Sequence, residues 1–222
     1  MSAAPPRLED TLVTGYKRLA SNAPDRLKDL ELRTLDILFS SVFLILFSPV
    51  ALVIALIMLV TSGRPVLYRG QRVGRGGHFF EMLKFRTLKP GAEERIGQYL
   101  GEELVRRTDV ELTRIGRWLK ASQLDEIPQL WNVLRGDMSL VGPRPERPTF
   151  VHEFKHKVPQ YMLRHRVKAG ITGWAQVHGW RGNTSIKKRI QYDLYYIENW
   201  SLTLDFKIIW LTLRHGLRHN AY

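Results

Sequence analysis

The chain contains no cysteine among its 222 residues. This absence excludes structural disulfides, a thiolate nucleophile and a thiolate metal site. Acidic residues are also few, because 21 Asp and Glu stand against 34 Lys and Arg and leave a formal net charge of +13. We therefore expect anionic partners: lipid headgroups, nucleotides, phosphorylated substrates or nucleic acid.

Charge is missing altogether from one stretch, the 24 residues from Ile37 to Val60. As a continuous helix it would be about 36 Å long, against a hydrocarbon core of roughly 30 Å. The stretch begins too far from Met1, and is too long, for the apolar part of a secretory signal. We interpret residues 35–62 as a permanent membrane element.

The centre and the flanks of this segment indicate how it meets the membrane. Basic residues such as Arg33 and Arg64 flank it on both sides, and short basic loops stay in the cytoplasm. Pro49 cannot donate a hydrogen bond to the preceding turn, whereas the Ser48 hydroxyl can reach back to the carbonyl left unpaired there. The pattern predicts a membrane bend at Ser48 and Pro49, within a re-entrant helix-break-helix hairpin. A spanning helix with a proline kink is the alternative.

The rest of the sequence predicts an α+β, helix-rich cytoplasmic domain with little β structure. An amphipathic helix is expected from Thr11 to Ala20, and a β-hairpin from Val66 to Thr87. Residues 91–107 are expected to form one charged amphipathic helix. The chain then divides into four parts: a polar segment (1–34), the membrane hairpin (35–62), the globular domain that would hold the chemistry (63–200) and an interfacial amphipathic helix (201–222).

One candidate site is the sequence His-Glu-Phe-Lys-His at residues 152–156. Its H-E-x-x-H spacing would place His152 and His156 on one helix face, as in zinc peptidases. Against this reading, Pro159 ends the helix within one turn, and His165 is the sole nearby candidate for a third ligand. A solvated helix face explains the pattern as well.

A second candidate site is the adjacent carboxylate pair Asp125 and Glu126, close to Pro128 and the expected start of a helix. Acids in a first helical turn are favoured by the helix dipole and need no chemical role. However, one carboxylate can attack phosphorus and another can hold Mg²⁺. Cations that could meet phosphate oxygens are numerous in the surrounding sequence: Lys84, Arg86, Arg114, Arg117, Lys120, Arg144 and Arg147. The pattern favours phosphoryl transfer.

Several motifs, in order, resemble the bacterial sugar transferases, which are monotopic polyprenyl-phosphate phosphoglycosyl transferases. The resemblance runs from about Arg33 to Leu213. The motifs that carry it are LDILFS, the Ser48-Pro49 bend, YRGQRVG, LKFRTL, LTRIGRWLKASQLDEIPQLWNVLRGDMSLVGPRPE, GITGWAQVHGWRG and YDLYYIENWSLTLDFKI.

This resemblance implies a two-step reaction at the cytoplasmic face of the bacterial inner membrane. Asp125 would attack the sugar-side phosphate of a UDP-sugar, releasing UMP and leaving a covalent phosphosugar-aspartate. Undecaprenyl phosphate would then take the phosphosugar and so start a surface polysaccharide. Glu126 would hold Mg²⁺ or activate the acceptor. The Asp125–Glu126 pair, called the dyad below, is therefore also the expected metal site.

The resemblance also implies binding residues and partners. Lys84, Arg86 and Lys120, with Arg114 from the same basic neighbourhood, would meet phosphates. The motif Pro143, Arg144 and Pro145 would lie near the nucleotide. Membrane lipid is an expected partner and nucleic acid is not, while both a monomer and a homodimer remain open.

The donor sugar is less defined by these motifs. The segment GITGWAQVHGWRG is most similar to the branch that transfers glucose-1-phosphate, with galactose-1-phosphate or an N-acetylhexosamine-1-phosphate as alternatives. The chain departs from the usual family pattern at Leu88, Ala169 and His178, all of them away from the dyad. From the charge alone, a non-enzymatic basic adaptor at the membrane surface is a further alternative.

Overall fold

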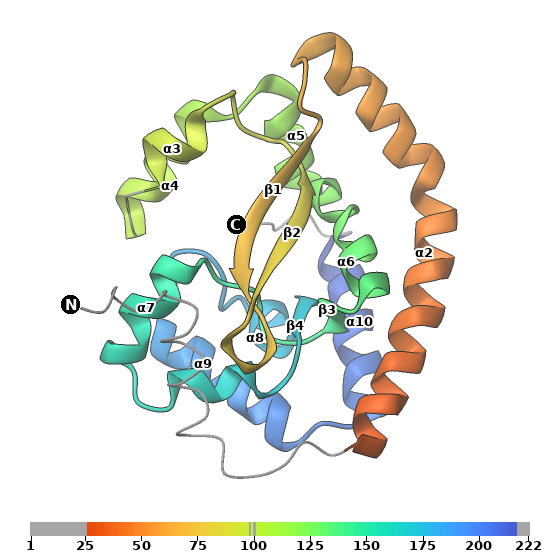
Figure 1. The fold of residues 1–222 in the computed structure, drawn as a ribbon, viewed down its shortest axis with the longest axis vertical. Helices are drawn as coiled ribbons and strands as arrows, with labels where there is room; N and C mark the ends of the chain where they lie inside the picture. Colours follow the sequence, from red (N-terminus) through yellow and green to blue (C-terminus); the bar gives the residue numbers. More distant parts are fainter. Residues whose placement is uncertain (1–25, 98, 100, 217–222) are drawn as a thin grey trace, which may run out of the picture.

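The computed structural model describes residues 26–97, 99 and 101–216. The amphipathic helix predicted for Thr11 to Ala20 lies outside these residues. Within them the fold is helix-rich, with two small two-stranded sheets, which agrees with the predicted α+β class (Figure 1). Its α-helices are α2 (Arg26–Thr61), α3 (Ala92–Ile96), α4 (Gly101–Glu111), α5 (Arg114–Ser122), α6 (Gln129–Arg135), α7 (Pro148–Lys157), α8 (Trp174–Val177), α9 (Ile186–Glu198) and α10 (Leu202–Gly216).

Helix α2 contains the apolar run and continues through Pro49. The break between two helices predicted at Ser48 and Pro49 is therefore wrong for this structure. The physical reason is a local hydrogen bond, because the Ser48 hydroxyl donates to the Ile45 carbonyl at 2.9 Å. Pro49 leaves that carbonyl without its usual N–H partner. With the acceptor paired, the helix continues past the proline, and Figure 1 shows α2 as one curved helix.

Helix α2 packs against the globular part near both of its ends. Near the start, the Asp36 carboxylate accepts hydrogen bonds of 2.9 Å from the Ser139 hydroxyl and the Leu140 N–H. Near the end, buried Met58 joins a core cluster that includes Phe85. Other apolar side chains of the helix are exposed: Leu38, Val42, Ile45, Leu46, Val50, Leu52, Val53, Leu56, Ile57 and Val60. By length and composition α2 is the one described helix that could cross a membrane.

The predicted hairpin is confirmed. Strands β1 (Leu67–Val73) and β2 (Phe79–Phe85) pair antiparallel, with Tyr68 opposite Lys84. The 3₁₀ turn η1 (Arg75–Gly77) joins them, and Gly76 and Gly77 take positive φ angles of 69° and 85° there. Glycine suits these positions because it adopts left-handed backbone conformations without steric cost.

A second sheet was not predicted. Strands β3 (Met138–Val141) and β4 (Ala169–Thr172) pair in parallel; β3 is buried throughout, and β4 is buried at its first two residues. Beyond the end of β3 the two backbones approach so closely that a Cβ atom on Gly170 would lie 2.1 Å from the Gly142 nitrogen. The glycines of the motifs "LVGPRPE" and "GITG" therefore permit this contact.

Two other predicted helices differ in extent from the structure. The single helix expected over residues 91–107 is divided into α3 and α4, and Gly101 at the start of α4 has a left-handed φ of 59°. The C-terminal helix is present as α10, described as far as Gly216. Phe206, Trp210 and Leu213 of α10 are exposed. Contact of this helix with a membrane interface stays a prediction.

Candidate active site

The dyad sits in the short connection between α5 and α6. Gln123 ends α5 in a left-handed conformation, with φ of 60°, and thereby turns the chain sharply. Asp125 and Glu126 then lie in the 3₁₀ turn η2 (Leu124–Glu126). This turn packs against β2, and the packing places the hairpin residue Lys84 beside both carboxylates.

Two cations hold the Glu126 side chain. The Lys84 ammonium lies 2.7 Å from Glu126 Oε1, and the Arg144 guanidinium lies 3.0 Å from the same oxygen. Lys84 is also 3.9 Å from the Asp125 carboxylate. These side chains come from β2, η2 and the loop after β3. The structure therefore brings together four of the site residues predicted from the sequence: Lys84, Asp125, Glu126 and Arg144.

The two carboxyl groups differ in acidity. Burial raises the pKa of Asp125 to about 6, and the Glu126 charge adds to this effect while Lys84 opposes it. Burial also disfavours ionised Glu126, but the charges and hydrogen bonds of Lys84 and Arg144 outweigh it and lower the Glu126 pKa to about 2. Glu126 is thus a permanent anion, whereas Asp125 is ionised at neutral pH but is the more basic oxygen nucleophile of the two.

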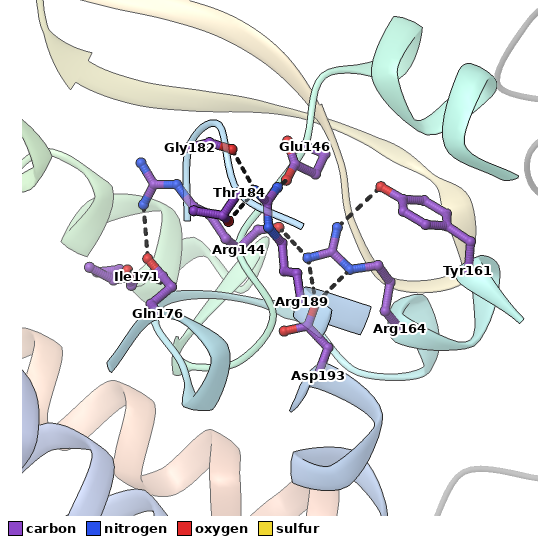
Figure 2. A network of polar contacts seen from close by, with 10 residues as sticks. All are labelled: Arg144, Glu146, Tyr161, Arg164, Ile171, Gln176, Gly182, Thr184, Arg189 and Asp193. Atoms are coloured by element: carbon purple, nitrogen blue, oxygen red, sulfur yellow. Dashed lines mark hydrogen bonds and ion pairs between the residues drawn. The ribbon is translucent and has the colours of Figure 1, made fainter. Parts of the chain in front are cut away.

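Arg144 is fixed at both its side chain and its backbone (Figure 2). The guanidinium donates to the Gln176 side-chain oxygen at 2.9 Å, in addition to Glu126. Its backbone carbonyl accepts a hydrogen bond of 2.9 Å from Arg164. Arg164 is 1% exposed and forms a buried ion pair with Asp193 of α9 at 2.8 Å. The position of Arg144 is therefore set by residues outside the dyad.

A second buried arginine holds the same loop. Arg189 of α9 pairs with the Glu146 carboxylate at 2.6 Å and donates to the Gly182 carbonyl at 2.6 Å (Figure 2). The Val73 N–H donates to the Glu146 carbonyl at 3.0 Å. The loop containing Pro143 and Arg144 is thus held between β1 and α9.

The dyad opens into a cleft of about 1570 Å³. Basic side chains outnumber acidic ones along its wall. The basic residues are Arg69, Arg72, Lys84, Arg86, Lys89, Lys120, Arg144, Arg147 and Arg181, and the acidic ones are Glu93, Glu94, Asp125 and Glu126. Part of the wall is apolar and belongs to α2 and α10: Phe43, Leu46, Phe47, Ile209 and Leu213. The cleft can therefore receive a group that carries both phosphate and hydrocarbon.

The other predicted binding residues lie at varying distances from the dyad. Arg86 lines the cleft, but its guanidinium donates to backbone carbonyls near the end of α2, including Ser62 at 2.6 Å and Gly63 at 2.9 Å. Lys120 lines the cleft and pairs with Asp109 at 3.3 Å. Arg114 is exposed at the first residue of α5 and is not part of the cleft wall.

Pro143 and Pro145 flank Arg144 in the loop after β3, where Pro143 is buried and Pro145 half-buried. The Pro143 carbonyl accepts a hydrogen bond of 3.0 Å from Gly170. The two prolines thus shape the loop that carries Arg144.

The H-E-x-x-H pattern forms no metal site among the described residues. His152 and His156 are exposed on α7, which ends at Lys157 as Pro159 predicted. His165 is buried elsewhere, against the Tyr161 ring. No group of three or more His, Asp or Glu side chains that could hold a metal occurs in the described part of the chain.

The dyad is suited to a magnesium ion that shares its coordination with a substrate. Asp125 and Glu126 supply hard carboxylate oxygens, and Mg²⁺ in phosphate-handling sites is commonly held by one or two carboxylates together with substrate phosphates and water. The low pKa of Glu126 keeps one of these ligands ionised.

Sequence reasoning missed the residues that support Arg144. Gln176 stands inside the motif GITGWAQVHGWRG, but nothing in that pattern indicates that its amide faces Arg144. Arg164 and Arg189 read as ordinary basic residues. Their burial at 1% and 5% exposure follows from the packing of η3 (Tyr161–Arg166) against α9 and could not be inferred from local sequence.

Comparison with known proteins gives consistent matches. The sequence model described as bacterial sugar transferase matches residues 27–219. The chain is 43% identical over 194 residues to the UDP-glucose:undecaprenyl-phosphate glucose-1-phosphate transferase of Klebsiella pneumoniae, covering 84% of this chain and 40% of that protein. It is 41% identical over 199 residues to a Caulobacter vibrioides protein of the same name, covering 87% of this chain and 73% of that protein.

A relative named for a different sugar is also similar. The UDP-N-acetylgalactosamine-undecaprenyl-phosphate N-acetylgalactosaminephosphotransferase of Aeromonas hydrophila is 41% identical over 184 residues, covering 82% of this chain and 42% of that protein. The chain thus spans well under half the length of the Klebsiella and Aeromonas relatives.

Proposed function

The chain belongs to the bacterial sugar transferase family, and from this premise we propose that it transfers a sugar-1-phosphate from a UDP-sugar to undecaprenyl phosphate. Glucose-1-phosphate is the proposed group, because several similar relatives are named for glucose. Galactose-1-phosphate and N-acetylhexosamine-1-phosphate are the alternatives, since relatives named for galactose and N-acetylgalactosamine also match. The product would start the assembly of a surface polysaccharide.

The observation that carries this proposal is the buried dyad with its two cations. In the first step an Asp125 carboxylate oxygen attacks the sugar-side phosphorus of the donor. The bond from that phosphorus to the bridging oxygen breaks, and UMP leaves with the electron pair. Asp125 suits this role because its carboxylate is ionised at neutral pH and is not held by a short ion pair, with Lys84 at 3.9 Å.

Lys84, Arg144 and Glu126 would control charge around the reacting phosphate. Lys84 and Arg144 place positive charge where phosphate oxygens would gather, and Glu126 holds both cations in position. Magnesium bound by the dyad would supply further positive charge to the phosphate oxygens. Gln176 and Arg164 keep Arg144 at this location.

In the second step a phosphate oxygen of undecaprenyl phosphate attacks the phosphorus bound to Asp125. The phosphorus–Asp125 bond breaks and the free carboxylate is restored. The apolar wall from α2 and α10 supports this assignment, since it could contact the isoprenoid chain while the lipid phosphate reaches the dyad.

We propose that the protein is monotopic at the cytoplasmic face of the inner membrane. The globular part packs on α2 at Asp36 and again at Met58, and about 33 Å of helix, measured along its curved axis at 1.5 Å per residue, separates these residues. If α2 crossed the bilayer with this packing intact, the globular part would also have to extend through the hydrocarbon core, because the packed length of α2 is similar to the thickness of that core. The exposed apolar side of α2 would instead enter one leaflet.

A covalent-adduct experiment tests the proposed chemistry. Protein in detergent is incubated with UDP-glucose and Mg²⁺ without lipid acceptor, and its intact mass is measured after acid quenching. We expect an added hexose phosphate that peptide mapping places on Asp125. The adduct should be absent in Asp125→Asn and retained in Glu102→Gln, the corresponding carboxylate-to-amide change at an exposed residue of α4.

Full turnover by Asp125→Asn would disprove the aspartate mechanism. The non-enzymatic adaptor predicts that Asp125→Ala supports glycan assembly in cells as well as the wild type does. A screen of UDP-glucose, UDP-galactose and the N-acetyl sugars would then identify the donor.

A further inference from the structure

Two arginines lie near each other on the cleft wall, away from the dyad. Val73 at the end of β1 forms an antiparallel bridge with Glu146. In antiparallel pairing the residue before one bridge partner lies opposite the residue after the other. The bridge is a single isolated one and Arg147 is the N-cap residue of α7. Arg72 nevertheless lies near enough to Arg147 for the two charges to interact, and both side chains line the cleft.

The neighbouring side chains show which face of β1 Arg72 occupies. Val73 is 1% exposed and belongs to a core cluster. Glu146 points to the interior and pairs with Arg189 at 2.6 Å (Figure 2). Because side chains alternate along β1, Arg72 points to the face opposite that of Val73. Arg147, the N-cap residue of α7, lines the same cleft. The carboxylate of Glu146 is thus committed elsewhere and does not neutralise the arginine pair.

Like charges that lie close together repel each other. Burial, together with the Arg147 charge, lowers the pKa of Arg72, although Tyr68 and Glu93 favour its charged form. Glu93 accepts a hydrogen bond from Arg147 at 3.0 Å. One paired carboxylate thus accompanies two neighbouring guanidinium groups on the cleft wall, an arrangement that a doubly charged phosphate would complement.

The arginine pair lies close to the dyad along β1. Tyr68 is opposite Lys84, and its hydroxyl extends over Gly70, where a Cβ atom would come within 2.2 Å of it. The same hydroxyl interacts with the Arg72 guanidinium. The cationic end of Arg72 therefore lies near Gly70, two residues or about 7 Å along the strand from Lys84.

We propose that Arg72 and Arg147 bind the nucleoside-side phosphate of the donor, the phosphate that leaves within UMP. This inference rests on the proposed function, in which Lys84 and Asp125 meet the sugar-side phosphate. When the bond from the sugar-side phosphorus to the bridging oxygen breaks, the bridging oxygen and its electron pair remain on UMP. The two guanidinium groups stabilise that added negative charge, and no proton transfer is required.

Equilibrium binding to the full chain in detergent tests this assignment at constant salt. The probes are UMP, uridine, which lacks the phosphate, and undecaprenyl phosphate. We expect Arg72→Gln and Arg147→Gln each to weaken UMP binding about tenfold or more, the loss typical of a charged hydrogen bond, while uridine affinity changes less than twofold. Arg106→Gln, which removes the same charge from an exposed site on α4, should bind all three probes as the wild type does.

Thermal unfolding separates a binding role from a structural one. Removing one of two neighbouring positive charges should leave the melting temperature unchanged or raised without ligand, and should reduce the rise that UMP produces. Arg72→Lys should retain part of that rise. The inference is overturned if both Gln variants bind UMP normally, if uridine binding falls as much as UMP binding, or if undecaprenyl phosphate alone loses affinity.

The experiment is independent of the covalent chemistry. Asp125→Asn should bind UMP through Arg72 and Arg147 even though it forms no adduct. If the proposed aspartate mechanism fails while the arginine variants still lose UMP, the nucleotide subsite stands on its own.

Discussion

Asp125 and Glu126 are adjacent in the chain, yet their carboxyl groups ionise in different pH ranges. Both are largely buried, and burial alone would raise both pKa values. Glu126 Oε1 accepts close contacts from Lys84 and Arg144 at 2.7 and 3.0 Å. Asp125 lies 3.9 Å from Lys84. Unequal access to the same cations therefore makes Glu126 the fixed anion and Asp125 the group that titrates near neutrality.

This difference predicts the pH dependence of the first chemical step. The attacking species is ionised Asp125, whose pKa is raised to about 6. The rate should therefore fall as the pH drops through the pKa of Asp125, at about pH 6 without metal and at lower pH when Mg²⁺ held by the dyad favours the ionised carboxylate. The measurement is the burst of UMP released from UDP-glucose in the absence of acceptor, at saturating donor and constant ionic strength.

Lys84→Met provides the matched comparison. Lys84 lowers the pKa of both carboxyl groups, so its removal should move the rising limb of the profile to higher pH as well as slow the step. A Lys84→Met profile that coincides with the wild-type profile, or a wild-type rate that is flat from pH 4 to 7, would contradict the assignment of the limb to Asp125.

At the scale of elements, short-range sequence patterns predicted the structural features that neighbouring residues determine. The hairpin around Gly76 and Gly77 follows from alternation and turn residues, and the structure confirms it. The dyad and Lys84 were recognised because their residue types suit phosphoryl transfer. The parallel pairing of β3 with β4 was missed, since its strands have four residues each and are separated by α7 and η3.

Long-range packing also explains what the sequence did not reveal about Arg144. Its partners Gln176 and Arg164 lie in α8 and η3, and only the folded chain brings them to the loop after β3. Arg86 illustrates the reverse case. As a basic residue it was predicted to bind phosphate, but its guanidinium donates to the backbone carbonyls of Ser62 and Gly63, just after α2. Phosphate binding by Arg86 remains a prediction.

Helix α2 predicts an energetic coupling between Ser48 and Pro49. Ser48→Ala in the wild type leaves the Ile45 carbonyl unpaired and should cost about 1 kcal/mol of unfolding free energy. In a Pro49→Ala background the backbone N–H restored at this position can donate to that carbonyl, so the same change should cost close to nothing. A double-mutant cycle by denaturant unfolding in mixed micelles measures the coupling.

Thr61→Ala serves as the comparison within the same helix. Its hydroxyl also donates to a carbonyl one turn back, that of Ile57 at 2.7 Å, but no proline removes the backbone donor there. Thr61→Ala should therefore cost the same in both backgrounds. Equal costs of Ser48→Ala in both backgrounds would mean that the serine does not compensate for the proline.

At the scale of the whole molecule, the lengthwise contact between α2 and the globular part predicts membrane topology. Both ends of α2 should lie on the same side as the dyad. The cysteine-free sequence allows single labels at Glu31→Cys, Arg64→Cys and, as a marker of the globular part, Lys157→Cys, all at exposed positions. A membrane-impermeant thiol reagent applied to sealed vesicles should label all three from one side, and Leu52→Cys on the exposed apolar side should be protected until detergent is added. Labelling of Glu31→Cys and Arg64→Cys from opposite sides would show that α2 crosses the bilayer, which would require it to separate from the globular part at Asp36 or at Met58.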